Sequence, residues 1–359
     1  MNGENLKQIA AHFDTYSSIE PYGDGHINDT YVAFSQKRYI LQKINTNIFT
    51  NPEQVMHNIH LVTEHIKKKL EKSGKYRSGS VLSLIPTVDG KSFYRSENGS
   101  CYRMYEFIEN ASSYSHADSA DVLYNAAKGF GNFFALLSDF DASQLYETIE
   151  NFHCTPMRYT AFEKAVKEDK CGRAKLAGEE INAIVSHREI ADVVTKLLGS
   201  NDIPLRVTHN DTKLNNIMLD NKTGEPVCVI DLDTVMPGSI LYDFGDSIRF
   251  GASSAAEDEQ DLSKVYCDME LFEAFTRGFL EQTGKFLTSK EKELLAFSAK
   301  LLTYECGMRF LTDYLNGDTY FKIHFENQNL YRARTQIKLV SDMEKKADIM
   351  QEIVMKYAG

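Results

Sequence analysis

The polar residues most able to do chemistry flank two short apolar runs, Ile217–Leu219 and Val227–Ile230. A segment containing Asp, Asn and Gly separates the runs, so they are expected to pair as a β-hairpin. The open end of that hairpin would bring Asn216 beside Asp231, and Asp211 lies five residues before Asn216. These few oxygen donors suit Mg²⁺ on a nucleotide, because this ion prefers oxygen ligands and leaves positions for phosphate oxygens.

The segment from His209 to Asn216 has the spacing H-x-D-x-x-x-x-N, which is the catalytic-loop pattern of kinases. In this interpretation Asp211 accepts or orients the proton of an attacking hydroxyl, and Asn216 and Asp231 hold the metal ion. Lys213 could reach the transferring phosphoryl group. The alternative is a surface hairpin with ordinary polar caps, which does not account for three acidic or amide groups meeting at one end of two apolar strands.

A nearby segment, Asp243-Phe-Gly245, spells the metal-binding motif of protein kinases. No simple hairpin connects it to Asn216, whereas Asp231 directly follows an apolar strand. We therefore predict that Asp231 is the metal ligand. Asp243 and Asp246 are expected to cap a following helix or to brace the catalytic loop.

Two glycines near the N-terminus, Gly23 and Gly25, lie in a turn between two strand-like runs. Such a turn lets backbone amides approach phosphates closely. We expect it to bind nucleotide phosphates, with Asn28 as a further polar contact. A plain hairpin turn is the alternative.

The next strand-like run ends in Gln42 and Lys43. Strand side chains alternate, so only one of the two can face the phosphates. Lys43 would supply the cation that kinases carry on their third strand, and it is the favoured choice. If Gln42 faces the phosphates instead, positive charge must come from Mg²⁺ and Lys213.

A clear hairpin signal with Asn98-Gly99 at its turn leads to the segment 105–108. We expect this segment to form the hinge between two lobes, with the backbone of Glu106 and Ile108 bonding the adenine edge. The alternative is that it is simply the last strand of the sheet. The helix expected from residue 51 to about residue 70 carries His57, His60 and Glu64 on one face, a spacing more typical of a solvated face than of a metal site.

The composition sets limits on the class of protein. A chain of 359 residues with 42% apolar residues can bury a large core, and its net charge of -11 argues against binding nucleic acid or an anionic membrane. There is no secretory signal pattern and no run long enough to span a bilayer, so a soluble, cytoplasmic protein is expected. A monomer is a separate expectation. The six cysteines are widely spaced, which favours reduced thiols.

The pattern of the chain predicts an α+β protein with a two-lobed, protein kinase-like fold. A small antiparallel sheet with one long helix would form a nucleotide-binding lobe over residues 1–107. The periodicity becomes helical from about residue 118 onward, which predicts a larger, mostly helical lobe over residues 108–359 that carries the catalytic hairpin. The helices expected in that lobe include one over residues 181–198 and one over residues 330–358. On a helix of that lobe Arg309 would either contact the acceptor or form a structural ion pair with Asp243, Asp246 or Asp313.

Taken together, several segments resemble the N-acetylhexosamine 1-kinases of the aminoglycoside phosphotransferase (choline kinase-like) superfamily. They are Tyr22–Asn28, Tyr39–Gln42, Thr208–Ile217, Ile230–Thr234, Asp243–Ala252, Glu305–Leu311 and Arg334–Val340. The resemblance implies ATP-dependent phosphorylation of the anomeric hydroxyl of N-acetylglucosamine or N-acetylgalactosamine. It also implies Asp211 as the base, Asn216 and Asp231 as Mg²⁺ ligands, and Arg309 and Tyr320 as sugar contacts. The family has glutamine in the third-strand motif, which weakens the assignment of Lys43.

Three other functions stay open from the sequence. One is a kinase of the same fold that acts on an aminoglycoside, choline or homoserine. Another is a metal-dependent phosphohydrolase, which should show more clustered His and Asp ligands. The third is a nucleotide-binding module without catalysis, which would be expected to lack Asp211 or Asp231. A P-loop enzyme is disfavoured, because no G-x-x-x-x-G-K-[ST] segment occurs.

Overall fold

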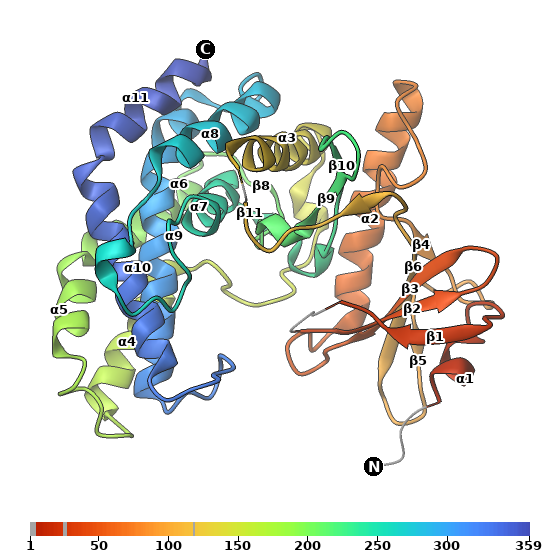
Figure 1. The fold of residues 1–359 in the computed structure, drawn as a ribbon, viewed down its shortest axis with the longest axis horizontal. Helices are drawn as coiled ribbons and strands as arrows, with labels where there is room; N and C mark the ends of the chain where they lie inside the picture. The colour runs from red at the N-terminus through yellow and green to blue at the C-terminus, as the bar shows by residue number, and fades with distance from the viewer. Residues whose placement is uncertain (1–4, 24–26, 118) are drawn as a thin grey trace.

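The N-terminal lobe is built on an antiparallel sheet, and the computed structural model describes residues 5–23, 27–117 and 119–359 of the chain. The sheet has the strand order β1-β2-β3-β6-β4, and β5 pairs with β6 (Figure 1). Its strands are β1 (Ser18–Pro21), β2 (Asp29–Phe34), β3 (Arg38–Ile44), β4 (Leu84–Ile85), β5 (Tyr94–Arg95) and β6 (Cys101–Glu106).

One long helix, α2 (Pro52–Lys72), lies in this lobe as predicted. It starts where the sequence indicated: the Asn51 side chain accepts a hydrogen bond from the amide of Gln54 at 3.2 Å, and Pro52 occupies the first turn. Its apolar residues Val55 and Ile59 join the main core, whereas the other face of the sheet packs on the short helix α1 (Leu6–Ala10). The two faces of the sheet therefore pack on different partners, and only the face that packs on α2 belongs to the main core.

A second, smaller sheet links the lobes. Strand β7 (Ala111–Ser112) follows β6 closely and pairs with β9 (Ile217–Asp220), which pairs in turn with β10 (Pro226–Val229). A two-stranded sheet of β8 (Arg206–Thr208) and β11 (Met236–Gly238) adjoins it. In Figure 1 the green strands β8 to β11 lie between the helical lobe and the N-terminal sheet.

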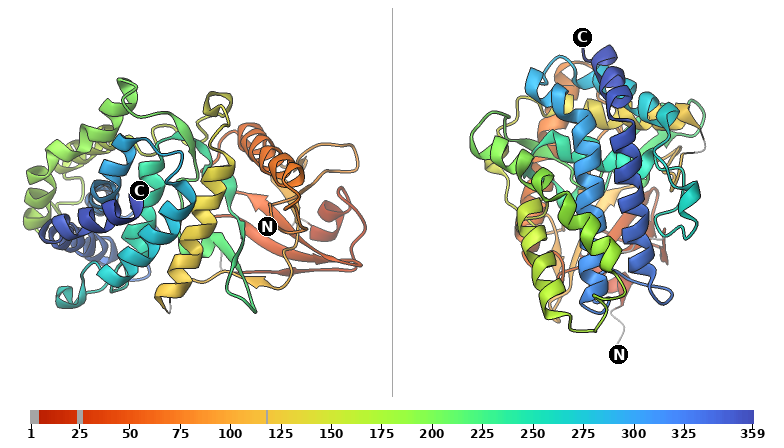
Figure 2. Two further views of the ribbon diagram at one scale, coloured as in Figure 1. Left: turned by 90° about the horizontal axis from the view of Figure 1, so that it is seen from above. Right: turned by 90° about the vertical axis from the view of Figure 1, so that its left-hand side faces the viewer.

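The C-terminal lobe is mostly helical, and its long helix α9 packs against α7, α10, α4 and α11, while α3 packs along α8 (Figures 1 and 2). A capping box of Thr288 and Glu291 fixes the start of α9. The helices are α3 (Ala120–Leu136), α4 (Thr155–Glu168), α5 (Gly178–Ser186), α6 (Val193–Gly199), α7 (Ile240–Gly251), α8 (Met269–Thr283), α9 (Ser289–Leu315), α10 (Gln328–Lys345) and α11 (Ala347–Ala358).

The architecture confirms the predicted α+β, kinase-like fold, with an antiparallel sheet first and a larger helical part after it. Two predicted helices are wrong in length. The segment 181–198 divides into α5, a 3₁₀ turn and α6, and the segment 330–358 divides at Lys346 into α10 and α11, because α11 packs on both α8 and α9 rather than continuing along α9 alone. None of the described helices combines the length and apolarity required to cross a bilayer.

Candidate active site

The predicted hairpin forms and defines one side of the candidate site. Strands β9 and β10 pair antiparallel, with Val229 opposite Ile217 at the open end. The amide of Ile230 donates to the carbonyl of Asn216 at 2.9 Å. Asn216 and Asp231 are therefore neighbours at the end of the hairpin where the sequence placed them.

The backbone of the loop that carries Asp211 is held by a side chain of α7. The buried carboxylate of Asp243 accepts hydrogen bonds from the amides of His209, at 3.1 Å, and Asn210, at 2.6 Å. Asp243 thus braces the catalytic loop, one of the two roles predicted for it. The side-chain amide of Asn216 donates to the backbone oxygen of Asp211 at 2.8 Å and to its carboxylate at 3.0 Å, which orients the proposed base.

Lys213 lies against the proposed base. Its Nζ is 2.7 Å from the Asp211 carboxylate. Burial favours a lower pKa for Lys213, but Asp211 and Asp246 outweigh it and raise this pKa above its ordinary value. The ammonium group therefore stays charged at neutral pH beside the position where a phosphoryl group would be transferred.

Asp231 has the geometry and charge environment of a cation ligand. It adopts the left-handed conformation with φ 57°, an uncommon one for a residue other than glycine. Burial and the nearby carboxylates of Asp233 and Asp211 raise its pKa to about 7, against the opposing effect of Arg103 and Lys213. Such crowding of negative charge favours a bound cation.

The donor set fits a Mg²⁺ ion that is shared with a nucleotide. Among the described residues none donates a hydrogen bond to the Asp231 carboxylate, and Asn216 uses its NH₂ group rather than its side-chain oxygen. Two oxygen donors thus remain for an ion whose other ligands would be water and phosphate oxygens. Within the same part of the chain, no three His, Cys, Asp or Glu side chains form a metal-binding group, so the trio on α2 is not such a site.

The cation that faces this site from the N-terminal sheet is Arg103, which the sequence analysis missed. Arg103 on β6 forms a buried ion pair with Asp233, and its Nη2 donates to Gln42 at 2.9 Å. Gln42 on β3 lies opposite Arg103 in the sheet register. The only signal in the sequence was an arginine within the apolar strand 101–105.

The register of β3 shows that the favoured orientation of Lys43 was wrong. Side chains alternate along a strand, and Gln42 faces the hairpin through its bond to Arg103. Lys43 lies on the opposite face, with its Nζ 5.8 Å from the ring centre of Tyr102, a residue of the α1-side core. Arg103 on the neighbouring strand takes the place on the hairpin-facing side that was predicted for Lys43.

Asn28 also has a different environment from the one predicted. Its NH₂ group donates to the Asp233 carboxylate at 2.7 Å, and its side-chain oxygen accepts from the amide of Asn45 at 2.9 Å. Asn28 therefore fastens the N-terminal turn to the loop after β10 and does not present both polar atoms to a ligand. Its predicted contact with phosphates is replaced by a structural bridge.

The first glycine of the predicted turn comes shortly after β1, and the predicted hinge segment begins with the last residues of β6. Gly23 follows β1 and has φ 71°, a conformation open to glycine without strain; Gly25 falls outside the described residues. In the predicted hinge segment, the amide of Glu106 donates a hydrogen bond to the carbonyl oxygen of Ser83 and so is not available to a ligand. No backbone partner of the Ile108 amide occurs among the described residues, which leaves that group as the candidate adenine contact.

Arg309 and Tyr320 come together near the end of α9. The guanidinium carbon of Arg309 lies 5.9 Å from the ring centre of Tyr320, 5.4 Å from that of Phe321 and 5.7 Å from that of Phe152. Among the described residues no carboxylate forms an ion pair with Arg309, so the alternative of a structural ion pair is wrong. Asp313 instead accepts hydrogen bonds from the amides of residues 319–321 and holds the Tyr320 segment.

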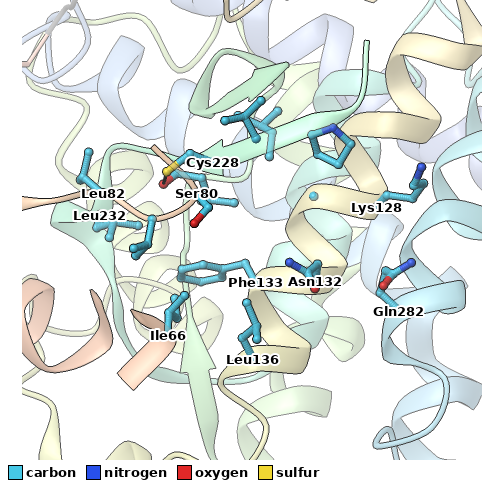
Figure 3. A pocket seen from close by; sticks show the side chains of 16 residues that line it. Ile66, Ser80, Leu82, Lys128, Asn132, Phe133, Leu136, Cys228, Leu232 and Gln282 are labelled. Carbon is cyan, nitrogen blue, oxygen red and sulfur yellow. Dashed lines mark hydrogen bonds between the residues drawn. The ribbon is translucent and has the colours of Figure 1, made fainter. Parts of the chain in front are cut away.

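A cavity of about 210 Å³ lies on the reverse side of the hairpin, away from Asp211. Figure 3 shows Phe133 and Leu136 of α3 pointing into it, with Cys228 of β10 and Leu232 on the other side. Its lining includes neither Asn216 nor Asp231. The cavity is therefore a packing space behind the site and not the site itself.

Comparison with known proteins gives consistent matches. The model of a family described as the phosphotransferase enzyme family matches residues 18–277. Among solved structures, amicoumacin kinase in complex with AMP-PNP and Ca²⁺ has a TM-score of 0.61 at 13% identity, covering 96% of this chain and 94% of that one. Spectinomycin phosphotransferase in complex with ADP and spectinomycin has a TM-score of 0.58 at 14% identity, over 95% and 98%. Choline kinase LicA from Streptococcus pneumoniae has a TM-score of 0.53 at 15% identity, over 94% and 97%.

Proposed function

This chain belongs to the phosphotransferase enzyme family, and from that premise we propose that it transfers the γ-phosphoryl group of ATP to the anomeric (C1) hydroxyl of an N-acetylhexosamine. The product would be the 1-phosphate of N-acetylglucosamine or N-acetylgalactosamine. The observation that carries the transferase chemistry is the meeting of Asp211, Asn216 and Asp231 at one end of the β9–β10 hairpin. The resemblance of the Arg309 and Tyr320 segments to N-acetylhexosamine 1-kinases supports the choice of acceptor.

The reaction requires little covalent work from the protein, because positioning and charge stabilisation dominate phosphoryl transfer. Asp211 is oriented by the Asn216 amide and accepts the proton of the attacking hydroxyl. Lys213, whose Nζ lies 2.7 Å from the Asp211 carboxylate, stabilises negative charge on the transferring phosphoryl group. Asn216 and Asp231 would hold Mg²⁺, which supplies charge neutralisation on the phosphates when it is bound.

ATP would occupy the space between the sheet and the hairpin. The glycine turn at Gly23 and Gly25 covers the phosphates in this proposal, and the backbone of the segment 106–108 receives the adenine edge, with the Ile108 amide as donor. The ion pair of Arg103 with Asp233 borders this space from β6, since Asp233 lies two residues after Asp231. The nucleotides bound to the similar kinases, ADP and AMP-PNP, support ATP as the co-substrate.

Arg309 and Tyr320 would contact the sugar. A guanidinium group donates to sugar and acyl oxygens, and an aromatic ring packs on a sugar face. Tyr320 is 63% exposed, so it has surface to offer a ligand, and Asp313 fixes its backbone.

Other small-molecule kinases of this fold are the competing proposal, since solved relatives include kinases for aminopropanol, ethanolamine and choline. A phosphohydrolase is less favoured, because the described residues show no cluster of three metal-ligating side chains. Phosphorus NMR of reactions with ATP, Mg²⁺ and each candidate acceptor distinguishes these functions. We expect a sugar 1-phosphate signal with the N-acetylhexosamines; phosphate release without acceptor, or transfer only to choline, homoserine or an aminoglycoside, would refute the proposal.

A further inference from the structure

Two arginines beside the proposed acceptor position lack a carboxylate partner. Arg158 on α4 and Arg309 on α9 form no ion pair with any residue in the described part of the chain, whereas neighbours such as Arg173, Arg188 and Arg249 each do. Resting on the proposed function, we infer that Arg158 is a second acceptor-binding residue. With Arg309 it binds an acyl oxygen of the acceptor and disfavours acceptors that carry an ammonium group.

Phe152 brings the two guanidinium groups together. Arg158 donates from Nη2 at 3.0 Å and from Nε at 3.3 Å to the Phe152 carbonyl oxygen, and Arg309 lies 5.7 Å from the centre of the Phe152 ring. The two bonds fix the plane of the Arg158 guanidinium, and among the described residues nothing accepts a hydrogen bond from its Nη1. Burial first, and then the charge of Arg309, lower the pKa of Arg158, consistent with two cations held close together.

Glu305 is close enough to act electrostatically on both arginines, but among the described residues its hydrogen bonds go to other partners and it forms no ion pair with either arginine. Glu305, four residues before Arg309 on α9, accepts hydrogen bonds from His153 Nδ1 at 2.8 Å and Thr155 Oγ1 at 2.5 Å. Asp246 is paired with Arg249 at 2.8 Å. The surroundings of Arg158 and Arg309 therefore keep an excess of positive charge.

This pair is linked to Asp211 through a short series of groups. Asp246 is near enough to Lys213, the partner of Asp211, to raise its pKa, and His153 is near enough to Asp246 to lower its pKa. His153 in turn bonds Glu305, which shares α9 with Arg309. In Figure 1 the loop after α9, which carries Tyr320, projects from the helical lobe toward the N-terminal lobe. This series connects the two arginines to Asp211, and the proposal places them on the helical side of the space in front of it.

The chemistry of such a pair selects among acceptors. A guanidinium in fixed geometry donates well to carbonyl and carboxylate oxygens, and two like charges repel an ammonium group brought beside them. An N-acetyl group offers a carbonyl oxygen and carries no charge. An unacylated amino sugar, choline or an aminoglycoside offers positive charge at the same place.

The test compares kcat/KM for N-acetylglucosamine, glucose and glucosamine in the full-length wild type and in Arg158→Gln, at a pH where the amine is protonated. We expect the wild type to prefer the N-acetyl sugar and to use glucosamine worst. Arg158→Gln should lower kcat/KM for N-acetylglucosamine roughly 10- to 100-fold, the usual effect of losing a charged hydrogen bond. Glucose should change little, and the discrimination against glucosamine should shrink.

Two further variants separate charge from geometry and guard against misfolding. Arg158→Lys keeps the charge but loses the planar fork, so it should still reject glucosamine while losing part of the N-acetyl preference. Arg188→Gln, on a surface arginine paired with Asp192, should leave all the ratios unchanged, and thermal melting should confirm that each variant is folded.

The inference and the proposed function fail in different ways. If the wild type phosphorylates another uncharged or anionic acceptor but no hexosamine, the proposed function fails. The role of Arg158 is then tested by comparing kcat/KM for that acceptor and for its amine analogue in the wild type and in Arg158→Gln. Equal losses for N-acetylglucosamine and glucose in Arg158→Gln overturn the role of Arg158. So does a wild type that prefers an ammonium-bearing acceptor.

Discussion

At the scale of single residues, Asp211 is the proposed base, and its neighbours fix the position of its carboxylate. The Asn216 amide and the Lys213 ammonium both bond its carboxylate, so its orientation is fixed from two sides. This is the arrangement expected of a positioned general base, which contributes to rate through its protonation state and not through binding.

Asp211→Asn is therefore expected to lower turnover by roughly 10²- to 10⁴-fold while leaving ATP affinity largely intact. The asparagine oxygen can still accept from Asn216, so the loop should keep its geometry. Steady-state kinetics and calorimetric titration with a non-hydrolysable ATP analogue measure the two quantities. Asp220→Asn, at the far end of the same hairpin, is the matched control, and a variant at position 211 with near-normal turnover would remove Asp211 from the mechanism.

Glu305 shows how a buried carboxylate is kept ionised. It is 1% exposed, and burial by itself would raise its pKa. His153, the hydrogen bond from Thr155 and the nearby Arg309 outweigh burial and hold the pKa of Glu305 below its ordinary value. Because the folded pKa is depressed, this carboxylate stabilises the fold above the ordinary glutamate pKa of about 4.3, and that contribution is lost as the pH falls through the folded pKa.

Glu305→Gln should thus be less stable than the wild type near neutral pH, and the difference between them should narrow as the pH falls below about 4. Thermal melting followed by circular dichroism between neutral and acid pH measures this difference. The exposed Glu352→Gln variant should melt like the wild type throughout. A difference for Glu305→Gln that is constant with pH, or that widens in acid, would contradict the assignment.

At the scale of elements, two glycines set how closely helices approach the site. A Cβ on Gly245 of α7 would lie 2.4 Å from the carbonyl oxygen of Ser298 on α9. This close crossing explains the glycine in the Asp243-Phe-Gly segment without a metal-binding role. A Cβ on Gly129 of α3 would lie 2.3 Å from Ile217 Cδ1 and 2.8 Å from Pro226 Cβ, so α3 packs directly on the two strands that end at the proposed metal ligands.

Gly129→Ala is expected to push the β9–β10 hairpin away from α3. Overpacking of this kind typically costs about 1 to 3 kcal/mol of unfolding free energy, and the shifted hairpin should also raise KM for Mg-ATP. Denaturant unfolding and nucleotide kinetics test both effects. Gly178→Ala, where a Cβ meets no atom within 4 Å, is the control and should be neutral or slightly stabilising. Equal unfolding free energies of the two variants would contradict the close packing of α3 on the hairpin.

Elements also divide into those the sequence could predict and those it could not. The β9–β10 hairpin and α2 follow from local signals: a turn with Asp and Gly in one case, an Asn cap and Pro52 in the other. The division of the last predicted helix at Lys346 had no such signal, since neither proline nor glycine occurs there. Packing of α11 on α8 and α9 decides it.

At the scale of the whole molecule, the pair of Arg103 and Asp233 connects the N-terminal sheet to the hairpin that carries the proposed metal ligands. The two side chains are 1% and 3% exposed, and Asn28 adds a hydrogen bond to the same carboxylate. A buried pair of this kind contributes little net stability when intact, but breaking it leaves an uncompensated buried charge.

Arg103→Met is accordingly expected to cost about 3 to 5 kcal/mol of unfolding free energy. The double variant Arg103→Met with Asp233→Asn should recover part of that loss, because the remaining partner is no longer charged. Denaturant unfolding of the wild type, the two single variants and the double variant completes a double-mutant cycle. Arg95→Met, which breaks the exposed pair with Glu53, should cost at most about 1 kcal/mol. A loss in Arg103→Met no larger than in Arg95→Met would contradict a coupling role.

The sequence by itself determined the catalytic loop and the hairpin, because residues 209–231 are close along the chain and their contacts follow from strand period and turn chemistry. Only the tertiary structure decided which side chains meet this hairpin from elsewhere. Asn28 reaches Asp233 across 205 positions and Arg103 across 130, and the choice of Gln42 over Lys43 depends on which face of the sheet the hairpin covers. Such contacts are set by how whole surfaces pack, which local spacing does not encode.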